Sequence, residues 1–202
     1  FGDGGTSEVD FHAAMNFAGV LRAPTVFFCQ NNQYAQSTPL AQQTASVTLA
    51  QKADAYGFEG IRVDGMDIIA VHTALDIAIA RARTGGGPTL IESVCYRYAP
   101  HSTYDGEPVY RARDEEQEWR ELDPLIRTRT YLTDKGLIDE TFETSIVQEM
   151  KVEVDKAITA LENMTLPDRK EAFLGTFAEM PPAIIEQLHN EQRLAGEPET
   201  DI

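Results

Sequence analysis

The sequence predicts an α/β fold: a doubly wound parallel sheet followed by a C-terminal helical segment. Short apolar runs at residues 25–30, 60–65 and 88–98 alternate with stretches of helical periodicity. Strands that alternate with helices of this length are typical of a parallel sheet covered on both faces by right-handed crossovers. The helical stretches between the strands are 8–22, 46–57 and 67–87, and those after the sheet are 114–136, about 139–163 and 181–195.

Local signals place the ends of these elements. Ser7 and Asp10 resemble a capping box at the start of the first helix. Gly57 is predicted to end the second helix, and the glycines at 85–87 the third. The opening stretch "FGDGG" reads as the end of a strand, so we expect the N-terminal part of the sheet to be missing from this chain.

Length and composition limit the organisation and the partners. The chain has 202 residues, of which 42% are hydrophobic, enough for one core plus an appendage. We expect an α/β domain at 1–125 and a helical extension at 126–202. A net charge of −16 argues against binding to nucleic acid or anionic membranes. No apolar run approaches the ~20 residues of a membrane helix, so we expect a cytoplasmic protein. Cys29 and Cys95 lie in apolar stretches and are expected to be reduced.

Two polar side chains follow two apolar strands of the predicted sheet. Asp3 follows the first strand and Asn32 the second, 29 positions later, with one helical crossover between them. Because ligands bind at the carboxyl ends of parallel strands, we expect these side chains to lie side by side. A carboxylate and an amide oxygen are ligands that magnesium prefers, and Gly4 and Gly5 allow a diphosphate to approach the backbone.

Each of these two motifs, taken alone, also occurs in places that bind no ligand. "GDGG" is common in turns and "NN" in helix caps, because Gly, Asp and Asn dominate such positions. The glycines at 85–87 follow a helix and precede a strand, which is the wrong order for a dinucleotide or phosphate loop. His12, His72 and His189 read as ordinary helix-face residues.

Taken together, the two pieces resemble the thiamin diphosphate signature. The stretches "GDGGTSEVDFHAAMNFAGV", "QNNQYAQSTP", "GIRVDGMD", "GPTLIESVCYRYAPHS" and "YRARDEEQEW" resemble the alpha subunit of the 2-oxoacid dehydrogenase first component, and most closely the bacterial pyruvate dehydrogenase type. The resemblance covers residues 1 to about 125 and is looser in the C-terminal helices. Val9 departs from the glycine that we expect in the family at that position.

The resemblance implies a set of site residues. Asp3, the side chain of Asn32 and the backbone carbonyl of Tyr34 would be the Mg²⁺ ligands, and Gly4 and Gly5 would donate N–H groups to the diphosphate. His101, in "YRYAPHST", matches the active-site histidine of the family, which lies beside the cofactor. Arg97 either orients this loop or forms a structural ion pair.

The same resemblance implies the chemistry and the partners. Thiamin diphosphate would decarboxylate a 2-oxoacid, and the product would pass to the lipoyl acyltransferase component. The activating glutamate comes from a beta subunit in this family, within a heterotetramer of two alpha and two beta chains, so this chain alone should be inactive. Gln30 favours pyruvate, since branched-chain relatives tend to carry arginine there.

Several alternatives remain open. The chain could act on branched-chain 2-oxoacids or acetoin, or it could be a non-catalytic binding or scaffold remnant of the fold. A single-chain enzyme such as a transketolase shares the signature, although the "YRYAPHS" loop argues against it. Residues 99–113 show no periodicity and are expected to form a lid that becomes ordered when cofactor binds.

Overall fold

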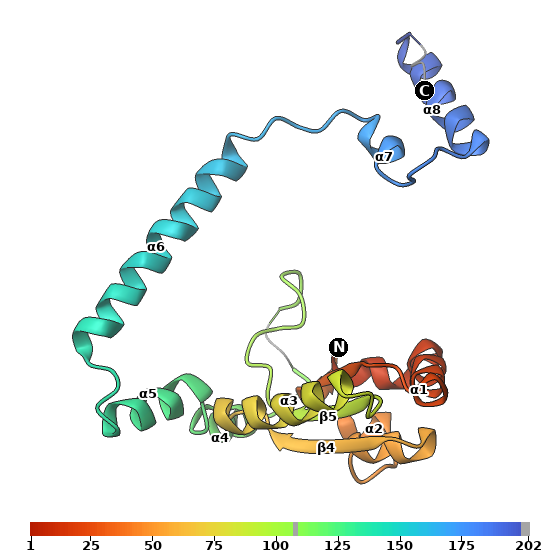
Figure 1. Ribbon diagram of the computed structural model, residues 1–202. Coiled ribbons are helices and arrows are strands. Elements are labelled where there is room, and N and C mark those ends of the chain that lie inside the picture. Colours follow the sequence, from red (N-terminus) through yellow and green to blue (C-terminus); the bar gives the residue numbers. More distant parts are fainter. Residues whose placement is uncertain (107–108, 199–202) are drawn as a thin grey trace. The chain divides into compact units, whose positions relative to one another are not determined.

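The computed structural model describes residues 1–106 and 109–198 and has the predicted α/β fold with a parallel sheet (Figure 1). The chain divides into two compact units, Phe1–Asp139 and the residues from Glu140 onward. The first unit contains the sheet. Within the described residues, no helix is long and apolar enough to cross a membrane.

The sheet has strands β1 (Val26–Asn31), β4 (Glu59–Asp64) and β5 (Thr89–Val94) in the order β1-β5-β4, all parallel. Gly2 forms a further parallel bridge with Gln30, and the Gln30 N–H donates to the carbonyl of Phe1 at 2.8 Å. The opening residues therefore run alongside β1, as the prediction of a strand end requires.

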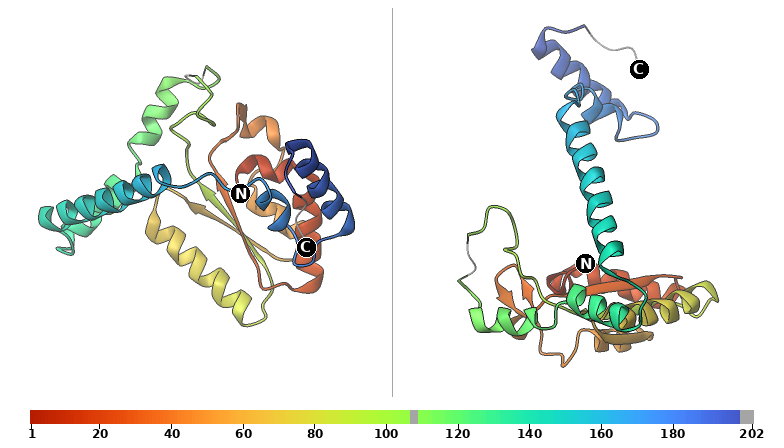
Figure 2. Two further views of the ribbon diagram at one scale, coloured as in Figure 1. Left: turned by 90° about the horizontal axis from the view of Figure 1, so that it is seen from above. Right: turned by 90° about the vertical axis from the view of Figure 1, so that its left-hand side faces the viewer.

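Helices cover both faces of this sheet, so the doubly wound prediction is confirmed (Figure 2). On one face, α1 (Val9–Leu21) and the 3₁₀ helix η2 (Ala50–Tyr56) enclose Leu90 of β5. On the other face, α3 (Ile68–Arg83) packs on Ile91. Successive residues of a strand point to opposite faces, and each of these fully buried side chains contributes ~1.5–3 kcal/mol.

Two local predictions are wrong. The predicted capping box at Ser7 does not form, because residues Asp3–Ser7 make a 3₁₀ turn, η1, which shifts the helix N-cap to Glu8. The predicted second helix at 46–57 shortens to η2, although Gly57 ends it at φ 77° as expected. The N–H of Ala50 donates to the buried Glu92 of β5 at 2.9 Å, and this long-range bond fixes where η2 begins.

A hairpin that the sequence did not predict follows β1. Strands β2 (Tyr34–Ala35) and β3 (Thr38–Pro39) pair antiparallel and lead into a short helix, α2 (Leu40–Gln43). Gln33 and Gln36 have positive φ values of 77° and 55°, which non-glycine residues seldom adopt. Neither residue is a strong turn former, so the sequence carried little signal for this hairpin.

The remaining helices lie on either side of the boundary between the two units. Helices α4 (Arg113–Arg120) and α5 (Pro124–Asp134) belong to the first unit. Arg127 of α5 contacts Asp64 at 2.9 Å and Asp67 at 3.4 Å, and these contacts attach α5 to the end of β4. The second unit contains α6 (Glu140–Glu162), α7 (Glu171–Leu174) and α8 (Pro182–Ala195). The domain boundary at residue 125 stays a prediction.

Candidate functional site

The structure brings Asp3 and Asn32 together at the carboxyl end of the sheet. Asp3 is buried at the start of η1, and the backbone N–H of Asn32 donates to its Oδ1 at 3.3 Å. A second donor, Nε2 of Gln43 in α2, lies 2.6 Å from Oδ2. The adjacency follows from the sheet, because the bridge between Gly2 and Gln30 places the two strand ends next to each other.

The two consecutive asparagines have different positions and partners. Asn31 is buried, donates to Glu92 at 2.7 Å and accepts from the N–H of Gln33 at 3.2 Å. Asn32 accepts from the N–H of Tyr34 at 3.2 Å. Asn31 therefore fixes the turn to the sheet, while Asn32 shapes the backbone that carries the Tyr34 carbonyl.

The surroundings of Asp3 fit a bound cation. Both hydrogen bonds described for its carboxylate come from neutral N–H groups, which orient the carboxylate without neutralising it. Burial raises the pKa of the nearby Cys29 thiol to about 12, and the negative charges of Asp3 and Glu92 add to the rise. A buried carboxylate is costly unless a positive charge accompanies it, so the site favours a cation beside Asp3.

The ligand set predicted for the cation does not consist mainly of acidic, histidine or cysteine side chains. Within the described ranges 1–106 and 109–198, no group of three or more His, Cys, Asp or Glu residues could hold a metal ion. The predicted set of Asp3, the Asn32 amide and the Tyr34 carbonyl includes only one such side chain. Carboxylate, amide and carbonyl oxygens are hard ligands, as Mg²⁺ requires.

The two glycines after Asp3 differ in how closely they are surrounded. A Cβ at Gly4 would lie 2.7 Å from the Cβ of Ala35, so only glycine lets η1 approach the hairpin this closely. A Cβ at Gly5 would lie 3.4 Å from the ring of Phe1. The Gly5 N–H donates to the carbonyl of Gly2 at 3.0 Å, and donation by Gly4 and Gly5 to a diphosphate stays a prediction.

Arg97 connects the Tyr34 carbonyl to His101. One Nη of Arg97 donates to the carbonyl of Tyr34 at 3.2 Å and lies 3.4 Å from Nδ1 of His101. The other Nη donates to the carbonyl of Gln36 at 2.5 Å and to the hydroxyl of Tyr110 at 2.8 Å. Among the described residues, these contacts of Arg97 are hydrogen bonds to the hairpin and the loop, which fits a residue that orients the loop. His101 itself is exposed.

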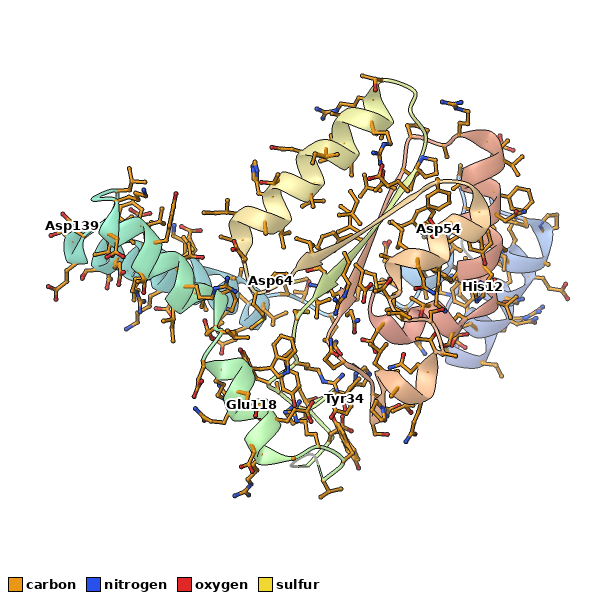
Figure 3. All side chains as sticks on the ribbon, turned by 90° about the horizontal axis from the view of Figure 1, so that it is seen from below. His12, Tyr34, Asp54, Asp64, Glu118 and Asp139 are labelled. Atoms are coloured by element: carbon orange, nitrogen blue, oxygen red, sulfur yellow. The ribbon has the colours of Figure 1, made fainter. Side chains whose placement is uncertain are left out.

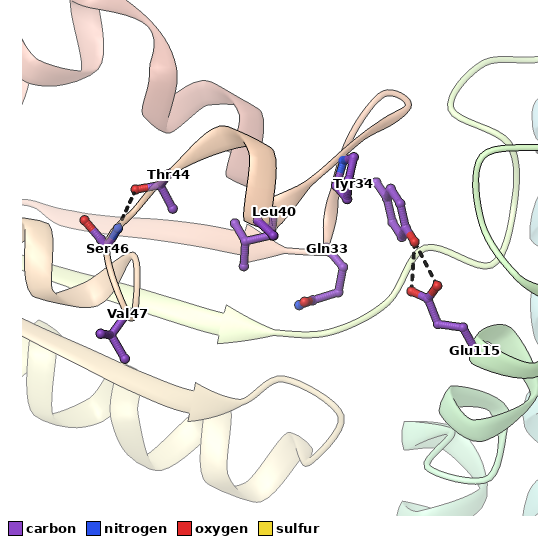
Figure 4. Close-up of a pocket in the computed structure, with 9 residues that line it drawn as sticks. Gln33, Tyr34, Leu40, Thr44, Ser46, Val47 and Glu115 are labelled. Carbon is purple, nitrogen blue, oxygen red and sulfur yellow. Dashed lines mark hydrogen bonds between the residues drawn. The ribbon is translucent and has the colours of Figure 1, made fainter.

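Helix α4 supports the hairpin through Tyr34. The phenol of Tyr34 donates to both carboxylate oxygens of Glu115, at 3.0 and 2.8 Å, beside a cavity of about 520 Å³ (Figure 4). Burial, with the hydrogen bond and charge of Glu115, raises the pKa of Tyr34 to about 12, so the phenol stays a donor. The ring of Tyr96 stacks on Trp119 of α4 at 5.5 Å and meets Tyr34 edge-on. No local pattern in the sequence indicated these partners of Tyr34.

The other two histidines of the first unit lie elsewhere. His12 is on α1, away from Tyr34 (Figure 3), and its Nδ1 is 2.5 Å from the hydroxyl of Tyr56. His72 forms an i,i+4 pair with Asp76 at 3.2 Å. Both cysteines are free, as expected.

Comparisons with known proteins agree with the geometry. The sequence profile described as "Dehydrogenase E1 component" matches residues 1–169. The pyruvate dehydrogenase E1 component subunit alpha of Staphylococcus aureus is 44% identical over 187 residues, which are 92% of this chain and 50% of that protein. The 3-methyl-2-oxobutanoate dehydrogenase subunit alpha of Mycobacterium tuberculosis is 44% identical over 200 residues, 99% of this chain and 54% of that protein. The chain thus spans about half the length of the curated relatives it matches.

Proposed function

Since this chain belongs to the dehydrogenase E1 component family, we propose that it is part of the alpha subunit of a thiamin diphosphate-dependent pyruvate dehydrogenase. The observation that carries the proposal is the buried Asp3 carboxylate, which meets Asn32 at the carboxyl end of the sheet and is bonded by neutral donors alone in the described contacts. This environment supports a cation, and a cation at this edge supports a diphosphate.

Asp3, Asn32 and the carbonyl of Tyr34 would hold Mg²⁺, and Gly4 and Gly5 would donate their N–H groups to the diphosphate. When bound, thiamin diphosphate supplies an electron sink for the decarboxylation of a 2-oxoacid. The Tyr34 carbonyl now accepts a hydrogen bond from Arg97, so coordination of Mg²⁺ by this carbonyl requires Arg97 to share or release it.

His101 would hold a proton at the reacting end of the site. Because Arg97 can only donate, the contact at 3.4 Å requires Nδ1 of His101 to accept, which leaves the proton of the neutral ring on Nε2. An Nε2–H group can donate to a phosphate or to a developing oxyanion. Arg97 therefore selects the tautomer in which His101 is a donor.

The proposed assembly contains further chains. A beta subunit would complete a heterotetramer of two alpha and two beta chains and supply the glutamate that activates the cofactor. A lipoyl acyltransferase component would receive the acyl group. The acidic net charge of −16 supports a role without nucleic acid or membrane partners. The proposed location is the cytoplasm.

Pyruvate is the preferred substrate in this proposal because Gln30 matches the pyruvate-type pattern. The Mycobacterium tuberculosis relative is named for 3-methyl-2-oxobutanoate and is equally similar, at 44% identity. A branched-chain 2-oxoacid is therefore the second candidate.

The test uses the full-length alpha subunit co-purified with its beta subunit. Calorimetric titration with thiamin diphosphate should show binding that requires Mg²⁺, and a substrate panel should show the highest kcat/KM with pyruvate. A higher kcat/KM with 3-methyl-2-oxobutanoate would replace the substrate but keep the enzyme class. Absence of cofactor binding in the assembled protein would identify a scaffold remnant and overturn the proposal.

A further inference from the structure

The side chain of Gln43, the last residue of α2, reaches back to the proposed cation ligand Asp3. We propose that Gln43 is a positioning residue that holds the Asp3 carboxylate in its metal-binding orientation and so sets the affinity of the site for Mg²⁺. The inference rests on the proposed function above, and it adds a residue that contacts neither cofactor nor substrate.

The orientation of the Gln43 amide is determined by its partners. Nε2 donates to Oδ2 of Asp3 at 2.6 Å and to the carbonyl of Thr38 at 3.0 Å. Both partners are acceptors, so the nitrogen and not the oxygen must lie there. The amide oxygen Oε1 consequently points away, and it is buried without a hydrogen-bond partner in the part of the chain that the structure describes.

An unpartnered buried oxygen indicates why the side chain is present. Buried polar groups are nearly always paired, and an exception needs a reason. If Gln43 served only to fill space, an apolar side chain of the same length would avoid the unpaired oxygen. The amide nitrogen is therefore the part of the side chain that the site needs.

A neutral donor suits a carboxylate that must still bind a cation. The N–H groups of Asn32 and Gln43 engage one oxygen of Asp3 each, which fixes the rotation of the carboxylate. Lysine or arginine at position 43 would fix it equally well but would also neutralise its charge. Glutamine orients Asp3 and leaves its full negative charge for the metal, as outer partners of metal-binding carboxylates do.

The same amide connects two segments of the site. Thr38 belongs to β3, which pairs with the strand that contains Tyr34. Gln43 therefore joins Asp3 to the hairpin that carries the third proposed ligand, and its loss should loosen the cation site as a whole.

The test compares Gln43→Met, which keeps the length but removes the amide, with Gln42→Met, at an exposed neighbour in the same helix. Mg²⁺ affinity is measured by calorimetry at saturating thiamin diphosphate, in the full-length alpha subunit assembled with its beta subunit. Gln43→Met should weaken Mg²⁺ binding by ~10–100-fold, the usual cost of removing an outer partner of a metal ligand. Gln42→Met should bind Mg²⁺ as the wild type does.

A second readout separates positioning from general damage. At saturating Mg²⁺, the cofactor affinity of Gln43→Met should return to the wild-type value, because mass action refills a weakened cation site. If Gln43→Met does not fold, Gln43→Asn keeps the amide but is one methylene too short to reach Asp3, and it should show the same loss. Wild-type Mg²⁺ affinity in the folded variant, or a cofactor defect that excess Mg²⁺ does not correct, overturns the inference. Asp3→Ala in the same assay tests the proposed function separately. If Asp3→Ala and Gln43→Met both bind Mg²⁺ with wild-type affinity, the proposed function fails. If Asp3→Ala loses Mg²⁺ binding and Gln43→Met does not, only the role of Gln43 fails.

Discussion

The two sides of the candidate site are built differently. On one side, Asp3 is buried and lies in a turn that hydrogen bonds attach to β1 and α2. On the other side, His101 is exposed, and within the described residues its side chain approaches Arg97 at 3.4 Å. The first side takes its geometry from the sheet, and the second takes it from the side chains of a loop.

This difference predicts that the two sides have separate functions. A residue fixed by the sheet can bind a cation without rearrangement, because its position is set by folding. A residue on an exposed loop can change position when a ligand arrives, at an entropic cost of ~1–2 kcal/mol per ordered residue. We therefore expect Asp3 to control whether cofactor binds and His101 to control what happens afterwards.

The largest effect should come from Asp3→Ala. Loss of the carboxylate should abolish Mg²⁺-dependent binding of thiamin diphosphate, because a metal supplies several kcal/mol of charge stabilisation. Calorimetry on the assembled enzyme measures the affinity for thiamin diphosphate in the presence of Mg²⁺. Asp10→Ala, at an exposed position of α1, is the control. Unchanged cofactor affinity in Asp3→Ala would remove the cation site from this turn.

His101→Ala should leave cofactor affinity near the wild-type value and lower turnover by at least ~100-fold, the range expected for one lost acid-base or oxyanion contact. The reason is that His101 lies on the loop side, outside the hydrogen bonds that hold Asp3. Steady-state kinetics and calorimetry measure the two quantities, and His72→Ala, on an exposed face of α3, is the control. Turnover close to the wild type would return His101 to the role of a surface residue.

In the loop at residues 99–113, Glu107 and Pro108 lie outside the described residues. Tyr104 is 100% exposed, whereas Tyr110 bonds to Arg97. Chymotrypsin should therefore cleave after Tyr104 quickly without ligand and slowly with Mg²⁺ and thiamin diphosphate. Cleavage after Tyr131 of α5, which is 45% exposed, should not respond. Equal rates at Tyr104 in both conditions would mean that this loop is not a lid.

The contrast between the Asp3 side, held by the sheet, and the His101 side, held by loop side chains, explains which features could be predicted from the sequence. Asp3 and Asn32 follow apolar strands, and the topology of a parallel sheet brings such strand ends together. The adjacency of these residues, separated by 29 positions, was therefore accessible from pattern alone. The α/β class followed for the same reason, since period and order determine it.

The remaining features depend on contacts that no local pattern encodes. Glu92 is one of several polar residues in β5, yet it bonds to Asn31 and to the N–H of Ala50. The role of Gln43 depends on a hairpin that itself contains two unexpected positive φ values. Long-range hydrogen bonds of this kind fix the η2 start and the hairpin, so periodicity could not reveal them.

The smallest effect should come from Tyr34→Phe, which separates the side chain of Tyr34 from its backbone. The carbonyl, the proposed metal ligand, is unchanged, so Mg²⁺ and cofactor affinities should stay within ~3-fold of the wild type. Loss of the hydrogen bond to the half-buried Glu115 should lower the free energy of unfolding by about 1 kcal/mol, measured by chemical denaturation.

The difference in the free energy of unfolding between wild type and Tyr34→Phe should be constant from about pH 7 to 9, where the phenol is neutral in both folded and unfolded chains. Because the folded pKa is raised to about 12, the stabilisation by the phenol is lost as pH rises from about 10 through 12, and the difference should shrink there. A 100-fold loss of Mg²⁺ affinity in Tyr34→Phe would show that the hairpin takes its geometry from side chains, as the His101 loop does, and would erase the contrast between the two sides of the site.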